Sequence, residues 1–200
     1  HPVPQDEIND LLVSLAREER CVVRLKGGDP FMFGRGSEEA LHLKHHGIDF
    51  EIIPGVTAAT GCSAYVGVPL THRGLATSVR YITGHCRDDQ DLDLDWRGLA
   101  DEDTTLVVYM GAASMAHIAV CLIRNGLPSA TPAMAVSQGT TRNQRQVVST
   151  LGEVADAVAD ADLPSPILFI VGRVVTLADG LAREAAHEVV DFDRASARHA

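Results

Sequence analysis

Residues 21–36, CVVRLKGGDPFMFGRG, join a β-branched run to a loop that is rich in glycine and charge. The run at 21–25 predicts a buried strand, because β-branched residues favour strands. Residues 24–36 hold four glycines, a proline, an aspartate and three cationic side chains. Glycine lets the backbone approach a ligand closely and adopt positive φ. The end of this strand is therefore a candidate ligand loop.

The elements around this loop alternate between strand and helix. Ser37 predicts the N-cap of a helix over residues 37–46, and Gly47 can end it. Such alternation is typical of an α/β fold with a parallel sheet. Further strands are predicted at 49–53, 79–83, 105–109, 133–137, 146–150 and 167–171, and further helices at 8–16, 57–66, 112–124 and 152–161. The polar stretch between 137 and 146 predicts a hairpin.

The chain divides most simply at PLTHRG, residues 69–74, because a proline and a glycine punctuate it. We predict one α/β domain over residues 1–74 and a second over 75–182. Residues 183–200 show weak periodicity, and we expect a disordered tail there. A doubly wound domain normally opens with a strand and its ligand loop, whereas this sequence opens in a helix. We therefore expect the first domain to be N-terminally truncated.

The composition disfavours several classes of function. The formal net charge is −10, and eight acids lie between Asp88 and Asp103, which disfavours nucleic-acid binding. No apolar run approaches the ~20 residues that a membrane-spanning helix needs. The four cysteines form no CxxC pair. Their spacing argues against a metal site or a disulfide framework and suits a reducing cytoplasm.

Six predicted strands end in turns that contain glycine: KGGDP, PGVT, TGH, MGAAS, SQGTT and GRVV. We expect all six at the same side of their strands, where open α/β sheets bind ligands. The phosphate-binding pattern GxxxxGK[ST] is absent, and GGDPFMFGRG does not match GxGxxG. Asp29 would repel a phosphate, but its carboxylate can accept hydrogen bonds from an ammonium group or ribose hydroxyls. These turns predict a cleft that binds something other than a nucleotide phosphate.

Six motifs occur in an order that resembles a known family: HPVPQDEIN, VVRLKGGDPFMFGRGSEE, IPGVTAATGCSAYVGVPLTHR, TGH, YMG and VGRVV. The chain resembles the uroporphyrinogen-III C-methyltransferases of the tetrapyrrole methylase superfamily. The resemblance runs from His1 to about Leu181. It implies two αβα domains with a cleft between them, and a cytoplasmic homodimer.

The resemblance also implies an activity. Members of this family methylate C2 and C7 of uroporphyrinogen III with S-adenosyl-L-methionine, which gives precorrin-2 for sirohaem and cobalamin synthesis. On this basis the cofactor-binding residues are Gly27, Gly28, Asp29, Met32, Thr57, Ala58, Met110 and Gly139. The family's catalytic aspartate and lysine are expected upstream of His1, so no residue here is assigned a catalytic role. No metal is expected.

The substrate carries eight carboxylates, so cations near the cleft are candidate binding residues. They are Arg24, Lys26, Arg35, His72, Arg73, Arg80, His85 and Arg87. His72 and Arg73 in the predicted hinge are the preferred pair, with Arg35 in the glycine-rich loop. Two other hypotheses stay open. One is another precorrin methyltransferase of the cobalamin pathway; the other is a catalytically incompetent fragment that binds the cofactor or a tetrapyrrole.

Overall fold

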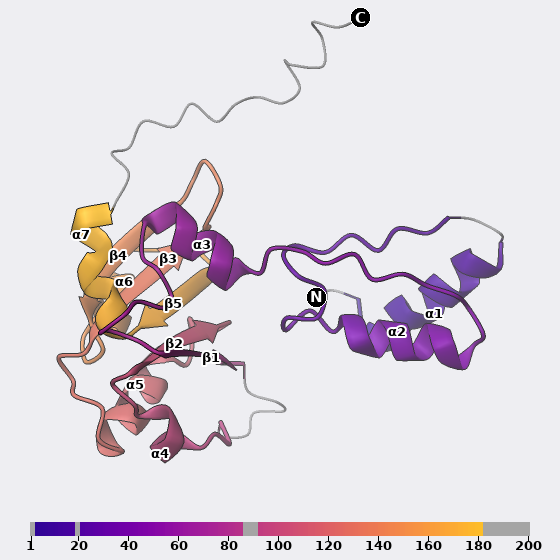
Figure 1. The fold of residues 1–200 in the computed structure, drawn as a ribbon. Coiled ribbons are helices and arrows are strands. Elements are labelled where there is room, and N and C mark those ends of the chain that lie inside the picture. Colours follow the sequence, from indigo (N-terminus) through magenta and orange to yellow (C-terminus); the bar gives the residue numbers. More distant parts are fainter. Residues whose placement is uncertain (1–2, 19–20, 86–91, 182–200) are drawn as a thin grey trace, which may run out of the picture. The chain divides into compact units, whose positions relative to one another are not determined.

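The computed structural model describes residues 3–18, 21–85 and 92–181. The chain forms two compact units, His1–Ala58 and Ala59–Ala200. Figure 1 shows helices and long connecting segments in the first unit and a sheet with surrounding helices in the second.

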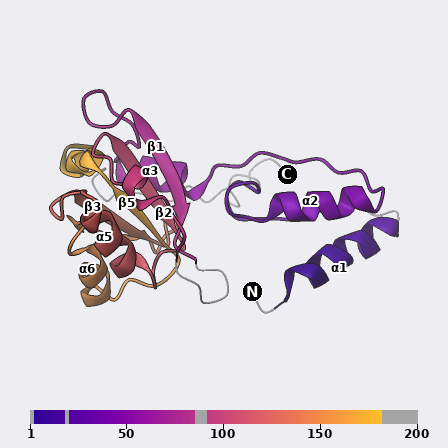
Figure 2. The same cartoon turned by 90° about the horizontal axis from the view of Figure 1, so that it is seen from below.

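Two helices organise the first unit, α1 (Gln5–Arg17) and α2 (Gly36–His45). The first turn of α1 carries Asp6 and Glu7, where the helix dipole favours acidic side chains. Leu12 of α1 is buried, and the two helices pack side by side, as Figures 1 and 2 both show. The helices that the sequence predicts at 8–16 and 37–46 are confirmed.

The strands predicted at 21–25 and 49–53 are wrong. Among the described residues, the first strand begins at Ser78, and both earlier segments lie outside any sheet. A strand needs a neighbouring strand to pair its backbone N–H and C=O groups. Neither segment has such a neighbour among the described residues, and their apolar side chains are not packed in a core either: Val23 is 78% exposed and Leu25 is 83% exposed.

The second unit contains a five-stranded sheet in the order β1-β2-β5-β3-β4. Its strands are β1 (Ser78–Thr83), β2 (Thr104–Tyr109), β3 (Pro132–Ser137), β4 (Arg145–Thr150) and β5 (Ile167–Val171). The pair β1–β2 is parallel, whereas β2–β5, β5–β3 and β3–β4 are antiparallel. The α/β class and the hairpin are confirmed, but the predicted parallel sheet is wrong. The sheet is mixed, because β5 lies between β2 and β3 with the opposite direction.

The strand directions decide which turns lie together. Because β2 and β3 are each antiparallel to β5, they run in the same direction as each other and as β1. Their carboxyl ends meet at one edge, here called the carboxyl edge, which carries Gly84, Met110 and Gly139. Gly172 after β5 lies at the opposite edge, where an added Cβ would stand 3.3 Å from Thr105 Cα. The expectation that all these turns share one side is therefore wrong for Gly172.

Helices lie on both faces of this sheet (Figure 1). They are α3 (Ala58–Val66), α4 (Trp96–Leu99), α5 (Met115–Arg124), α6 (Val154–Asp160), η1 (Arg173–Leu177) and α7 (Ala178–Leu181). Leu106 and Val108 of β2 join one buried cluster with Ile118 and Leu122 of α5. Val107 lies between them and points to the other face, because side chains alternate along a strand.

The boundary between the two compact units follows Ala58. The residues after it belong with the sheet, and Ala59, Val66 and Val68 are all buried. The assignment of residues 1–74 and 75–182 to two domains stays a prediction, and the tail at 183–200 lies outside the described residues.

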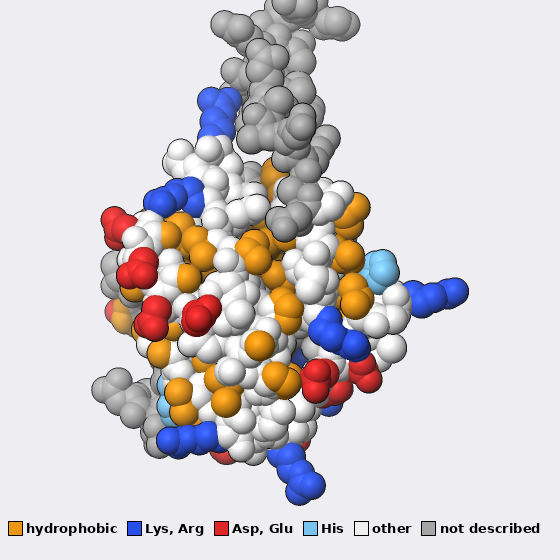
Figure 3. All heavy atoms as spheres, turned by 90° about the vertical axis from the view of Figure 1, so that its left-hand side faces the viewer, with side chains coloured by type: hydrophobic (Ala, Val, Ile, Leu, Met, Phe, Trp, Pro, Cys, Tyr) orange, Lys and Arg blue, Asp and Glu red, His pale blue; other side chains and the backbone are white. Residues whose placement is uncertain are grey.

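On the face of the second unit drawn in Figure 3, apolar side chains are scattered among polar atoms, and most charged groups lie toward the rim. Within the described part of the chain, no helix has the length and apolar character needed to cross a membrane.

Candidate functional site

The glycine-rich loop of the first unit is a compact turn held by its own backbone. The Met32 N–H donates to the Asp29 carbonyl at 3.2 Å, and the Gly36 N–H donates to the Pro30 carbonyl at 3.1 Å. Gly28 has φ +85°, a left-handed conformation that costs free energy for any residue with a side chain. The loop therefore needs glycine at position 28 for its shape alone.

Asp29 ties this loop to the segment that follows residues 49–53. Its Oδ1 accepts from the Phe31 N–H at 2.9 Å, and its Oδ2 accepts from the Gly55 N–H at 3.1 Å. The bond from Gly55, followed by that from Phe31, lowers the pKa of Asp29 below its ordinary value of 3.8. Both carboxylate oxygens therefore already accept backbone hydrogen bonds, and the contact of Asp29 with a cofactor stays a prediction.

The predicted cofactor residues of the first unit lie together. A Cβ added at Gly55 would stand 2.3 Å from the Gly28 carbonyl oxygen, so the two backbones touch. A Cβ added at Gly28 would stand 3.6 Å from the Val56 carbonyl oxygen, 3.8 Å from Ala58 N and 3.9 Å from Thr57 Cα. The loop at 27–29 and the segment at 55–58 thus form one small surface.

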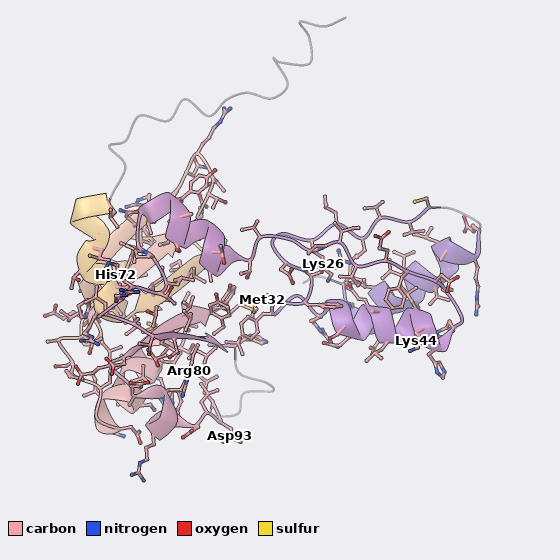
Figure 4. All side chains as sticks on the ribbon, viewed as in Figure 1. Lys26, Met32, Lys44, His72, Arg80 and Asp93 are labelled. Atoms are coloured by element: carbon pink, nitrogen blue, oxygen red, sulfur yellow. The ribbon has the colours of Figure 1, made fainter. Side chains whose placement is uncertain are left out.

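Gly27 is the open position on that surface. A Cβ added there would meet nothing within 4 Å, and the residue is exposed. The packing of the chain therefore does not require glycine at this position, and its backbone is accessible to a ligand. Met32 is half-buried in the same loop, and Figure 4 labels its position.

The other predicted cofactor residues lie on the carboxyl edge of the second unit. Met110 follows β2 with φ +52° and is 51% exposed. The preceding residue, Tyr109, is buried, and its hydroxyl accepts from the Ala59 N–H at 2.9 Å. This bond fixes the first turn of α3, where Ala58 lies, next to the end of β2.

Gly139 also contacts α3. A Cβ added there would stand 2.2 Å from Cys62 Sγ. Gln138 and Thr140 on either side have φ of +48° and +65°, so the turn after β3 is sharply wound. Burial raises the pKa of the Cys62 thiol. The turn after β3, the end of β2 and α3 therefore form one packed group.

The candidate substrate cations occupy different environments. Arg35 already pairs with Glu38 through two bonds, Nη2 to Oε2 at 2.6 Å and Nε to Oε1 at 2.9 Å. Those bonds raise the pKa of Arg35. Arg24 and Lys26 bond Glu39, and Arg80 bonds the Gly98 carbonyl.

His72 and Arg73 are exposed and lie in a tight turn of the second unit. Figure 4 labels the position of His72. The His72 and Ala76 backbones exchange hydrogen bonds at 3.1 and 3.0 Å, and Gly74 between them has φ +85°. His85 is exposed on the carboxyl edge, while Arg87 lies outside the described residues. In the described ranges, no three His, Cys, Asp or Glu side chains are grouped to hold a metal ion.

The sequence reasoning missed Tyr109 and Glu39. Tyr109 directly precedes Met110 at the end of an apolar strand, so its residue type alone suggested core packing. Glu39 sits in a helix whose neighbouring side chains are mostly polar, which gave no signal of burial. Only the fold brings their bonding partners to them.

Residues 1–155 match the family described as Tetrapyrrole (Corrin/Porphyrin) Methylases. The match covers more than half of the chain. The chain belongs to the tetrapyrrole methylase family.

Similar curated proteins carry two names. This methylase chain is 54% identical over 182 residues to a siroheme synthase of Pseudomonas putida, covering 91% of the chain and 39% of that protein. It is 52% identical over 182 residues to a uroporphyrinogen-III C-methyltransferase of Paracoccus denitrificans, covering 91% of the chain and 63% of that protein. The chain therefore spans less than two thirds of the length of these relatives.

A solved structure of uroporphyrin-III C-methyl transferase from Thermus thermophilus, complexed with S-adenosylhomocysteine, superposes on this methylase chain with a TM-score of 0.75 at 41% identity. The match covers 86% of the chain and 75% of that protein. A cobalt precorrin-4 methyltransferase superposes with a TM-score of 0.77 at 24% identity, which shows the shared fold.

Proposed function

We propose that the protein containing this sequence uses S-adenosyl-L-methionine to methylate C2 and C7 of uroporphyrinogen III, which gives precorrin-2 for sirohaem and cobalamin synthesis. The observation that carries the proposal is the contact between the loop at 27–29 and the segment at 55–58, which leaves Gly27 open. The names of the relatives support the same reaction.

The residues of each unit fit the proposed cofactor. Gly27 presents accessible backbone, and Gly28 and Asp29 hold that backbone in place beside Thr57 and Ala58. On the carboxyl edge, Met110 offers an exposed apolar side chain for an adenine or thioether, and the Gly139 turn lies against α3. When bound, the cofactor supplies an activated sulfonium methyl group.

The contribution of the protein is then binding and orientation. Holding the acceptor carbon in line with the methyl group can lower the barrier by several kcal/mol. His72 and Arg73 are exposed and available to pair with substrate carboxylates. Arg35 would share its charge with Glu38, so we assign it a weaker part in substrate binding. No residue of this chain is assigned a role in proton transfer.

The test is a methylation assay with the protein that contains this sequence. Methyl-labelled S-adenosyl-L-methionine and uroporphyrinogen III are incubated with it, and the product is examined by NMR. Label at C2 and C7 is the expected result. Label transferred only to a later corrin intermediate would favour another precorrin methyltransferase, and cofactor binding without transfer would favour a binding module.

The assembly and compartment belong to the same proposal. A cytoplasmic homodimer agrees with the resemblance, and the described cysteines Cys21, Cys62 and Cys121 are free. Sedimentation of the purified protein tests the dimer, and a single monomeric species would contradict it. Fractionation of source cells, with the protein traced by antibody, tests the compartment.

A further inference from the structure

Glu39 is a buried carboxylate at the centre of the first unit. It lies in α2 and is only 4% exposed. A buried charge without partners costs several kcal/mol, so its surroundings must supply hydrogen bonds and opposite charge. The carboxylate is therefore a point where the first unit concentrates polar contacts.

Three side chains supply those contacts. Lys26 Nζ lies 2.9 Å from the carboxylate, Gln5 Nε2 donates to Oε1 at 3.1 Å, and Arg24 Nε donates to Oε1 at 3.2 Å. The Gln5 side chain also donates to Asn9 Oδ1 at 3.0 Å. Burial, the largest single effect, opposes ionisation of Glu39. The bonds from Lys26 and Gln5 and the charges of Lys26 and Arg24 together outweigh it, so the pKa of Glu39 lies below its ordinary value.

Lys26 has a second acceptor, and this acceptor lies in the glycine-rich loop. Its Nζ donates to the Gly34 carbonyl at 2.5 Å, and its side chain is 13% exposed. Lys26 and Gly34 stand at the two ends of the loop, residues 27–33. The hydrogen bond from the Lys26 ammonium group to the Gly34 carbonyl therefore joins these two ends. Figure 4 shows Lys26 on the segment that enters the loop.

We propose that Glu39 is a positioning residue for the cofactor, acting through Lys26 without touching the ligand. Its charge holds the Lys26 ammonium group against the Gly34 carbonyl and so fixes the two ends of the loop. Asp29 fixes the middle of the same loop to Gly55. The inference rests on the proposed function, because it takes residues 27–32 as the cofactor-binding loop.

The competing interpretation is that Glu39 only joins α1 to α2. The chain offers a matched control for that role: His42, on the same helix, has its Nε2 atom 3.2 Å from Asp10 Oδ1 of α1, on the side of α2 that faces α1. A His42→Gln variant loses a contact between the helices and leaves the Lys26–Gly34 bond intact. If Glu39 only joined the helices, all three variants would bind the cofactor alike. A positioning role predicts weaker cofactor binding in the Lys26 and Glu39 variants and unchanged binding in His42→Gln.

The experiment compares Lys26→Met, Glu39→Gln and His42→Gln in the protein that contains this sequence. Calorimetry measures Kd for S-adenosylhomocysteine, and steady-state kinetics separate KM for S-adenosyl-L-methionine from kcat. We expect Lys26→Met and Glu39→Gln each to raise Kd and this KM about tenfold, which corresponds to about 1.4 kcal/mol. The rise in KM for S-adenosyl-L-methionine should exceed any change in kcat at saturating cofactor, and His42→Gln should bind like the wild type.

Hydrogen exchange keeps this inference separate from the proposed function. The Met32 and Gly36 amides, which donate within the loop, should exchange faster in Lys26→Met than in the wild type. If the wild type binds no S-adenosylhomocysteine, the proposed function fails. If the exchange rates are unchanged in Lys26→Met, the Lys26–Gly34 hydrogen bond does not stabilise the loop, and the inference is overturned. If Glu39→Gln does not fold, Lys26→Met decides alone. A folded Lys26→Met protein that binds with wild-type Kd overturns the proposal.

Discussion

The hydroxyl of Tyr109, at the last position of β2, accepts a 2.9 Å hydrogen bond from the backbone N–H of Ala59 in the first turn of α3. Both residues are buried. Each is a sequence neighbour of a predicted cofactor residue, Met110 in one case and Ala58 in the other. One buried bond, between residues fifty positions apart, therefore joins the end of β2 to the first turn of α3.

Removing that hydroxyl should weaken both stability and cofactor binding. In Tyr109→Phe the Ala59 N–H loses this acceptor inside the protein, which costs about 1–3 kcal/mol. Urea denaturation measures the loss of unfolding free energy, and calorimetry measures the rise in Kd for S-adenosylhomocysteine. A Tyr109→Phe protein of wild-type stability would show that the bond has no energetic role.

Gly139→Ala should be destabilising because of one specific neighbour. The added methyl group would stand 2.2 Å from Cys62 Sγ, and overpacking of this kind costs about 1–3 kcal/mol. Shortening the neighbour by Cys62→Ala should relieve most of that cost, since Cys62 Cβ lies 3.6 Å away. Thermal unfolding of the two single variants and the double variant measures the coupling. Additive losses would place the strain elsewhere.

Gly28→Ala tests the shape of the loop. Its φ of +85° is unfavourable for alanine by about 1–2 kcal/mol, although the new methyl group would have ordinary contacts of 3.6–3.9 Å. We expect weaker cofactor binding with only a modest loss of stability. Gly47→Ala is the control, because its φ is +70° and its added Cβ meets nothing within 4 Å, away from the loop. Equal cofactor affinity in the two variants would argue against a special role for Gly28.

Acid should destabilise the first unit through Glu39. Its pKa in the folded protein is lowered from the ordinary value of 4.5, so its stabilising contribution is complete above that pH and is lost as pH falls through the folded value. Asp29 acts in the same direction. Unfolding free energy measured by urea between pH 3 and 7 should therefore fall less steeply at acid pH in Glu39→Gln. Parallel curves for variant and wild type would contradict this account.

Arg73→Ala should affect the substrate and not the cofactor. An exposed ion pair contributes about 0.2–1 kcal/mol, so KM for uroporphyrinogen III should rise by a factor between about 1.4 and 5. The KM for S-adenosyl-L-methionine should stay constant. Arg124→Ala is the matched control, because Arg124 ends α5, away from the carboxyl edge where α5 begins. If the two substitutions raise KM for uroporphyrinogen III equally, Arg73 acts only as a general surface charge.

Local patterns were enough to predict the strands of the second unit. Strands such as 105–109 and 167–171 are continuous apolar runs, and burial of every residue in β2 and β5 agrees with that composition. The direction of β5 was not predictable, because a buried strand carries no local mark of whether it runs parallel or antiparallel to its neighbours. Because β5 runs antiparallel to β2 and β3, Gly172 lies at the edge opposite the carboxyl edge.

The first unit shows the opposite case. Residues 21–25 and 49–53 have strand composition, but composition cannot supply the neighbour that a strand requires. The glycine-rich loop was predictable as a special backbone, and Gly28 does have positive φ. The hydrogen bonds of Asp29 were not predictable. Its two partners, the N–H groups of Phe31 and Gly55, lie on either side of α2 in the sequence.

The direction of β3 gives the second unit a side that is available for labelling. The turn at Asn125 and Gly126 leads into the start of β3, so it lies at the opposite edge from Met110 and Gly139. Both turn residues are exposed, and an added Cβ at Gly126 would meet nothing within 4 Å. A fluorophore attached at position 125 would thus report on the folding of the sheet from the edge opposite the predicted cofactor contacts Met110 and Gly139.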